Sequence, residues 1–238
     1  MKKIKKIIKS ALRHLGYDLD CERRLKHYRN FLSYGFATIL DIGANVGQFS
    51  REMLDTFPDA HIYAFEPVAG CYEKLKKVSD KLNFHPLPYA LGNQTGETTI
   101  NVSSYDPSSS ILPMSDLHKK LFPHTAGGHA ETIQIRRLDD ITGGIDFKLP
   151  LLIKMDVQGY EKEVVLGGSE TFKKASVVLS ETSFASLYAG QPLADEMRDL
   201  LGEFGFEYRG ALNNKKHPQT GEVLFEDSVF VKIAMGKQ

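Results

Sequence analysis

Short apolar runs alternate with amphipathic segments along much of the chain. Such apolar runs occupy residues 38–42, 61–65, 83–90, 151–155 and 176–179. Segments with the spacing of helices follow the first, second and fourth of them, at residues 48–57, 71–79 and 160–167. Strands that alternate with helices are typical of a parallel sheet covered on both faces, with the ligand site at the carboxyl ends of the strands. The pattern predicts an α/β domain.

The alternation is interrupted between residues 91 and 140. Residues 97–102 and 131–137 alternate polar and apolar positions like strands, and a Ser-, Pro-, Gly- and His-rich segment, 103–130, separates them. We expect an inserted antiparallel pair that flanks a long loop, and we expect this loop to close over a bound substrate, because loops of this length are usually functional or disordered.

The remaining segments complete the predicted sheet. Residues 25–35 and 193–204 have the pattern of helices, and residues 206–211 and 228–233 predict a terminal antiparallel pair joined by the turn-rich residues 213–221. Pro86 and Pro88 indicate that the third strand is irregular or lies at an edge. The sequence therefore predicts a seven-stranded, mostly parallel Rossmann-like sheet with an antiparallel insertion.

Length and composition favour one globular domain. The chain has 238 residues, of which 42% are hydrophobic, which suffices for a single α/β core. Its cysteines, Cys21 and Cys71, are too few for a disulfide scaffold and form no CxxC motif, so we expect a cytoplasmic protein. No apolar stretch approaches the roughly 20 residues that span a bilayer.

Charge is distributed unevenly although the formal net charge is zero. Residues 1–30 carry a charge of +7 and the rest of the chain −7, and Ile4, Ile8, Leu12 and Leu15 recur at helical spacing among lysines. We therefore divide the chain into a basic amphipathic helical arm, residues 1–35, and a globular α/β domain, residues 36–238. Packing on the domain is the first interpretation of this arm, contact of residues 1–15 with an anionic membrane at the inner face is the second, and nucleic acid is the least favoured partner.

The segment TILDIGANVG, residues 38–47, predicts a nucleotide pocket. A buried strand, residues 38–42, has Asp41 at its end, and the chain then turns on Gly43 and Gly47 before a helix begins. A dinucleotide fingerprint has the form GxGxxG, whereas these glycines are four residues apart. Because a carboxylate can accept hydrogen bonds from an ammonium group, Asp41 favours a nucleoside that carries an amino acid, such as S-adenosylmethionine.

Glu66 supplies the second half of the pocket. It follows the strand at residues 61–65, where a carboxylate can accept both ribose hydroxyls of an adenosine. The predicted cofactor-binding residues are those of the glycine turn and of the next two strand ends: Asp41, Gly43, Ala44, Asn45, Gly47, Glu66, Pro67 and Ala90.

An ordered set of motifs resembles a known family. ILDIGANVGQFS, YAFEP, ALGNQTGETTI, IKMDVQGYEKEVVLGG and SETSF occur in this order between about Ile39 and Val231. Together they resemble FkbM-type S-adenosylmethionine-dependent methyltransferases. The resemblance implies a class I methyltransferase fold and methyl transfer to an oxygen of a small molecule, often a sugar or secondary metabolite.

Asp156 and Glu181 are the candidate catalytic residues, since each is expected just past the end of a strand. Methyl transfer is an in-line displacement that needs mainly positioning, and a carboxylate can accept the proton of an alcohol. Asp156 is the first choice for this base and Glu181 the second. Structural roles stay open for both: Asp156 as a helix cap or a ligand of the methionine end, and Glu181 as an ion-pair partner of Lys154.

Metal-assisted transfer is the alternative mechanism. Asp156, Glu161 and Glu181 could offer hard oxygen ligands, but the chain lacks a recognisable metal motif, so we favour the metal-free route and predict no metal site. The histidines of the long segment, His118, His124 and His129, match no metal spacing and are weak candidates for catalysis.

Other functions fit the chain less well. The turn after the fourth strand is Asp-Val-Gln-Gly, not the Asn/Asp-Pro-Pro-aromatic turn of adenine amine methyltransferases, and neither cysteine lies near that strand to attack cytosine. A nicotinamide oxidoreductase and a non-catalytic cofactor-binding or membrane-associated protein are the two alternatives that stay open.

Overall fold

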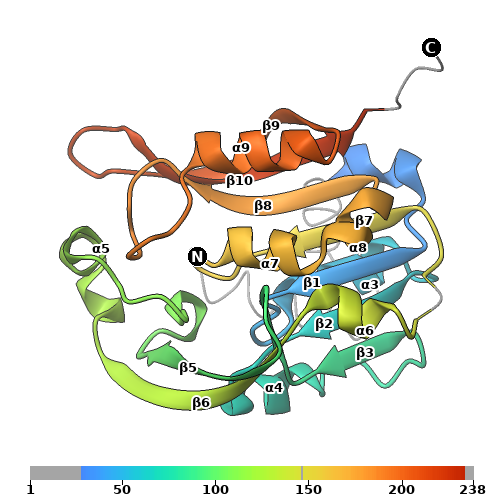
Figure 1. Ribbon diagram of the computed structural model, residues 1–238, viewed down its shortest axis with the longest axis horizontal. Helices are drawn as coiled ribbons and strands as arrows, with labels where there is room; N and C mark the ends of the chain where they lie inside the picture. The colour runs from blue at the N-terminus through green and yellow to red at the C-terminus, as the bar shows by residue number, and fades with distance from the viewer. Residues whose placement is uncertain (1–27, 146, 234–238) are drawn as a thin grey trace, which may run out of the picture.

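The computed structural model describes residues 28–145 and 147–233. Its main feature is a seven-stranded sheet in which strand β10 runs opposite to the other six (Figure 1). The strand order is β3 (Phe84–Leu87), β2 (His61–Phe65), β1 (Thr38–Ile42), β7 (Leu151–Met155), β8 (Val177–Ser183), β10 (Val223–Lys232) and β9 (Phe206–Lys216). This mostly parallel arrangement confirms the predicted class I architecture.

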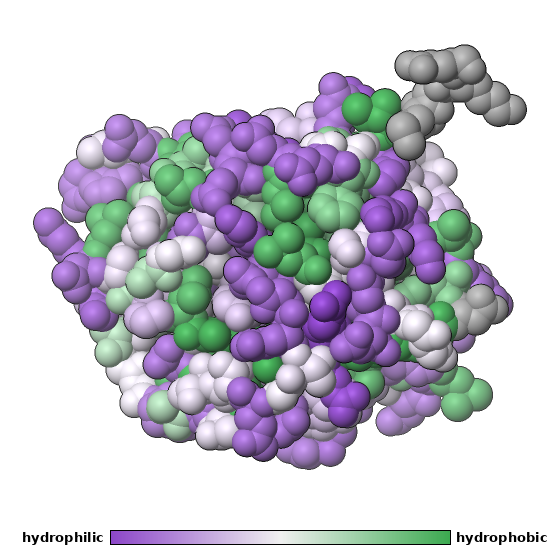
Figure 2. All heavy atoms as spheres, in the orientation of Figure 1, coloured by the Kyte–Doolittle hydropathy of each residue, from purple (hydrophilic) through white to green (hydrophobic). Residues whose placement is uncertain are grey.

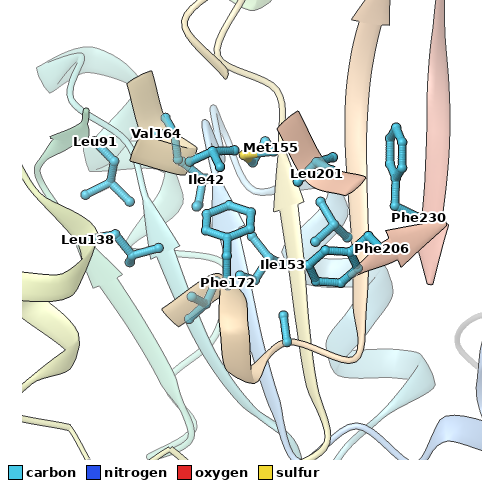
Figure 3. Close-up of a cluster of buried hydrophobic side chains, with 14 of the residues drawn as sticks. Ile42, Leu91, Leu138, Ile153, Met155, Val164, Phe172, Leu201, Phe206 and Phe230 are labelled. Atoms are coloured by element: carbon cyan, nitrogen blue, oxygen red, sulfur yellow. The ribbon is translucent and has the colours of Figure 1, made fainter. Parts of the chain in front are cut away.

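Helices cover both faces of the sheet because the central strands are apolar on both sides. Ile39 of β1 packs with α3 (Gln48–Thr56), α4 (Ala69–Leu75) and the 3-10 helix η1 (Arg29–Tyr34). Leu40 faces the opposite layer, which contains α6 (Leu138–Thr142), α7 (Glu161–Gly167), α8 (Ser169–Lys174) and α9 (Ala194–Glu203). Figure 3 shows this second layer, where Phe172 and Leu201 from the helices meet Ile153 of the sheet.

The predicted insertion is a second sheet of three strands. Its order is β4 (Ala90–Leu91), β6 (Gly128–Arg136) and β5 (Gly96–Ser103), with β5 and β6 antiparallel as expected. The segment between them folds into short helices: η2 (Asp106–Ser108), α5 (Asp116–Leu121) and η3 (Pro123–Thr125). Figure 1 shows β5 and β6 extending to one side of the main sheet, with α5 beyond their ends.

Several boundaries differ from the prediction. The expected strand at residues 83–90 is divided between β3, which lies at the edge of the main sheet, and β4 of the second sheet. Strand β8 was predicted to end at Leu179 but continues to Ser183, because its antiparallel pairing with β10 extends that far. Strands β9 and β10 are likewise longer, and α8 was not predicted.

The face of the molecule drawn in Figure 2 is mostly polar. Figure 2 shows hydrophilic side chains over much of one face, with apolar side chains gathered in small groups. Within the described residues, no helix has the length and apolar character that crossing a bilayer requires. Most of the predicted basic arm lies outside the described residues, and its described end, η1, packs through Phe31 on the core.

Candidate functional site

The loop after β1 brings backbone close to the end of β7. Gly43 has a φ of 75°, and a Cβ there would lie 2.0 Å from the backbone oxygen of Asp156. Gly47, with a φ of 80°, leaves a Cβ no room beside Val78. The non-glycine residue Asn45 also adopts the left-handed region, with a φ of 49°. A side chain at either glycine would therefore open the turn, which accounts for the glycine pattern.

The side chain of Asp41 is buried inside the domain and does not line the cavity described below. Its carboxylate is fully buried, accepts a hydrogen bond of 2.7 Å from Ser50 Oγ and lies 3.2 Å from Lys154 Nζ. Lys154 Nζ also donates to the backbone oxygen of Gly43 at 2.9 Å. Burial acts to lower the pKa of Lys154, but the charges of Asp41 and Asp156 outweigh it and raise that pKa. Asp41 and Lys154 thus form a buried ion pair that holds the glycine turn, and direct contact of Asp41 with the ammonium group of the cofactor stays a prediction.

Glu66 lies at the end of β2 and faces the cavity. Its two carboxylate oxygens accept hydrogen bonds of 2.8 Å from the backbone N–H groups of Asn45 and Val68. Burial raises the pKa of Glu66 to about 7 although these two hydrogen bonds act to lower it. Since each carboxylate oxygen has two lone pairs, both can still accept a hydroxyl. This geometry suits the predicted role at a ribose.

Asp156 and Glu181 lie next to each other at the other end of the site. Met155 of β7 pairs with Ser180 of β8, so the residues that follow these two are neighbours on adjacent strands. The expectation that Glu181 follows the fifth strand is wrong: it lies inside β8, opposite Asp227 of β10. Burial and the nearby charge of Asp156 raise the pKa of Glu181 well above its ordinary value.

A cavity of about 380 Å³ joins these groups. It is lined by eight of the ten predicted site residues: Gly43, Ala44, Asn45, Glu66, Pro67, Ala90, Asp156 and Glu181. Asp41 and Gly47 lie behind the lining. Residues on the inserted segment, among them Ser110 and Ile111, also line it, as expected of a segment that covers the acceptor. The volume is within the range of small-molecule sites.

Sequence reasoning missed several lining residues. Tyr89 and Tyr160 supply aromatic surface, and Gln158 supplies an amide between the two acids. Gln158 could have been noticed, since it lies in the turn that directly follows the fourth predicted strand. The tyrosines carry no comparable signal, because their contribution depends on how the two sheets approach each other.

The histidines of the insertion lie outside the cavity lining. His118 is buried, its Nε2 lies 3.1 Å from Thr125 Oγ1, and its ring packs on Phe122 and Tyr188. Burial lowers the pKa of His118. Across residues 28–145 and 147–233 there is no group of three His, Cys, Asp or Glu side chains arranged to hold a metal ion.

Comparison with known proteins shows the family to which the chain belongs. A model of the methyltransferase FkbM domain matches residues 41–208. The chain belongs to the FkbM methyltransferase family. This membership confirms the resemblance seen in the motifs and makes the protein an S-adenosylmethionine-dependent methyltransferase.

Relatives and solved structures agree with this assignment. The chain is 33% identical over 184 residues to the 2-O-methyltransferase NoeI of Sinorhizobium fredii, covering 70% of this chain and 71% of the relative. It is 27% identical over 143 residues to the hexuronic acid methyltransferase AglP of Haloferax volcanii, covering 59% and 54%. The fold matches the structure of methyltransferase FkbM from Methylobacillus flagellatus with a TM-score of 0.52 at 14% identity, over 83% of this chain and 44% of that one.

The described residues of this FkbM protein fit the cofactor. Glu66 offers acceptors for ribose hydroxyls, and the glycine turn offers close backbone at the carboxyl end of β1. The nicotinamide alternative is disfavoured by the family assignment. When bound, S-adenosylmethionine supplies the methyl group as a sulfonium, and the protein's own residues must place the acceptor in line with it.

Proposed function

We propose that the protein transfers the methyl group to a hydroxyl oxygen of a sugar, a glycan or a small metabolite, with Asp156 as the general base. The observation that carries this proposal is the position of the Asp156 carboxylate: it lines the same cavity as Glu66 and its side chain is 40% exposed. A carboxylate that is accessible from the cavity can accept the proton of an alcohol.

The chain's own residues support this role. Lys154 Nζ lies 3.8 Å from Asp156 Oδ2, and Gln158 Nε2 donates to Asp156 Oδ1 at 2.7 Å. These contacts hold the carboxylate at the end of β7. Glu66 fixes the nucleoside end of the cofactor, so the acceptor hydroxyl needs only to lie between Asp156 and the sulfonium for in-line attack. The proton leaves the hydroxyl for Asp156 as the new oxygen–carbon bond forms and the carbon–sulfur bond breaks.

The printed functions of two relatives point to the same acceptor class. NoeI is named a 2-O-methyltransferase and AglP a hexuronic acid methyltransferase. The acceptor of the present chain is proposed by analogy with these names and by the chemistry of Asp156.

Incubation with methyl-labelled S-adenosylmethionine tests the proposal. The acceptor panel should contain glycans, lipid-linked sugars and hydroxylated metabolites, each paired with an analogue that carries an amine in place of the hydroxyl. We expect label in hydroxylated acceptors only. Label in the amine analogues alone, or in nothing, would contradict the proposed acceptor class.

The basic arm carries a separate proposal. We propose that contact of residues 1–15 with an anionic membrane at its inner face is the second role of this arm, after packing on the domain, and that nucleic acid is not a partner. These residues lie outside the described part of the chain, so the support is their charge and helical spacing alone.

A further inference from the structure

Gln158 occupies an unusual backbone position at the reactive end of the cavity. Its φ of 54° lies in the left-handed region, which is uncommon for a residue with a long side chain. The side chain lines the cavity, and its Nε2 donates to Asp156 Oδ1 at 2.7 Å and to Glu181 Oε1 at 3.1 Å. One neutral amide thus joins the two candidate acids. Strained backbone at such a place indicates a functional constraint.

The amide has a fixed orientation. The NH₂ group of Gln158 faces the two carboxylates, and its Oε1 faces Tyr188 Oη at 2.8 Å. The single hydrogen of Tyr188 Oη is shared between this oxygen and the backbone oxygen of Ser108 at 3.1 Å. The backbone oxygen of Gln158 accepts a hydrogen bond of 2.7 Å from Ser110 Oγ, on the inserted segment. Gln158 is therefore anchored both through its side chain and through its backbone.

The side chain of Glu161 also holds the backbone of the turn around Gln158. The N–H groups of Val157 and Gly159 donate to Oε1 of the buried Glu161 at 3.1 and 3.3 Å. Gly159 has a φ of 97°, and a Cβ there would lie 3.0 Å from Gln191 Cβ. The turn therefore has little freedom to move away from the two acids.

Asp156 and Glu181 lie in a group of ionisable side chains that come from several elements. Asp156 follows β7, Glu181 lies on β8, Asp227 on β10 and Glu161 on α7, and the phenol of Tyr188 closes the group. Lys154 is the cation among these neighbours, and it is shared with Asp41. Two neighbouring carboxylates tend to hold one proton between them, which would occupy the base. The NH₂ group of Gln158 donates one hydrogen to each carboxylate, and this reduces the repulsion between them without adding charge.

We propose that Gln158 is a positioning residue that keeps Asp156 and Glu181 from sharing a proton and keeps the Asp156 carboxylate available to the acceptor hydroxyl. The inference rests on the proposed role of Asp156 as the base. Tyr188 contributes by orienting the amide.

Two substitutions separate the amide from the backbone that carries it. Gln158→Gly removes the side chain and tolerates the observed φ, whereas Gln158→Glu keeps the length and adds a third carboxylate. Tyr188→Phe removes only the hydroxyl that orients the amide. Gln134→Glu is the matched control, because Gln134 Nε2 donates to Glu97 at 2.9 Å on the exposed surface of the second sheet, outside the cavity lining.

The kinetic readout is the pH profile of kcat with the acceptor that the labelling panel identifies. In Gln158→Gly we expect kcat to fall about 10- to 100-fold through misplacement of the base. We expect KM for S-adenosylmethionine to stay within about threefold, since the lost interaction acts in the transition state. In Gln158→Glu the acid limb of kcat should move up by about 1 pH unit, because like charges hold the proton longer. Tyr188→Phe should shift it less, and Gln134→Glu should leave it in place.

A carboxyl titration by ¹³C NMR in the cofactor-bound protein needs no acceptor. If the wild type methylates nothing, the proposed function fails, and this titration still tests the inference. A titration that moves to higher pH in Gln158→Glu, and not in Gln134→Glu, supports it. An unchanged titration in Gln158→Glu would overturn the inference, and so would an unchanged kcat with an unchanged acid limb in both Gln158 variants. If Gln158→Gly does not fold, the comparison of Gln158→Glu and Tyr188→Phe with the wild type tests the inference in its place.

Discussion

Replacement of Glu66 by Gln should lower the affinity for the cofactor without abolishing its binding. The carboxylate accepts backbone hydrogen bonds from Asn45 and Val68 and has lone pairs left for the ribose hydroxyls. At pH 8, above the pKa of about 7 that burial gives Glu66, the carboxylate is mostly ionised, and Gln keeps one acceptor oxygen and loses the charge and the second acceptor. A hydrogen bond to a charged group contributes about 1.5 to 3 kcal/mol. Loss of one such bond corresponds to a roughly 10- to 100-fold higher Kd.

Isothermal titration calorimetry measures this change directly. S-adenosylmethionine and its demethylated product share the ribose, so both should lose affinity by the same factor. Glu97→Gln, an exposed change on β5, is the control and should bind like the wild type. Since the NH₂ group that Glu66→Gln introduces would face a backbone donor, the melting temperature must show that the variant is folded under the assay conditions. Affinity within twofold of the wild type, or loss for only one of the two ligands, would refute the ribose contact.

Three further predictions concern the base, the buried acid beneath it and the basic arm. Asp156→Asn should lower turnover by on the order of 10² to 10⁴ with cofactor affinity retained, and EDTA should have no effect on the wild type; activity that is lost on chelation and restored by magnesium would favour the metal route instead. Burial raises the pKa of Glu161 from 4.5 to about 7, so the folded state binds the proton more tightly and the free energy of unfolding should fall as pH rises through this window, by on the order of 3 kcal/mol. Glu161→Gln keeps an acceptor for the two backbone N–H groups and should make this dependence less steep in urea titrations at pH 5 and 8, with the remainder due to Glu66 and Glu181; an equally steep dependence would show that Glu161 does not contribute to it. Deletion of residues 1–15 should abolish sedimentation with anionic liposomes and leave cofactor affinity intact, whereas equal binding of the full chain to neutral liposomes would count against an electrostatic contact.

The central strands could be predicted closely because their signal is local. Strands β1, β2 and β7 have the bounds that their apolar runs indicate, since each is mostly buried and is followed by a glycine or an acid, Gly43, Glu66 and Asp156. The end of β8 could not be predicted in this way. Its last residues, among them Glu181, are polar and are held in the strand by pairing with β10, which lies over forty residues away in the sequence.

The candidate site shows the same limit. Glu66 and Asp156 could be found because a polar residue at the end of a parallel strand faces the crevice. The buried partners of Asp41 could not, since Lys154 is opposite Asp41 only through the register of β1 with β7. Nor could the approach of Tyr188 to Gln158, which depends on the path of the segment after β8.

The most direct test of the central claim follows two isotopes in one reaction. Transfer from ¹³C-methyl S-adenosylmethionine to an acceptor enriched in ¹⁸O at its hydroxyl should give a product that carries both labels on one ether, with an equal amount of demethylated cofactor. Mass spectrometry and ¹³C NMR read both. A methyl group found on nitrogen or carbon, or a product that has lost the ¹⁸O, would contradict methyl transfer to the hydroxyl oxygen.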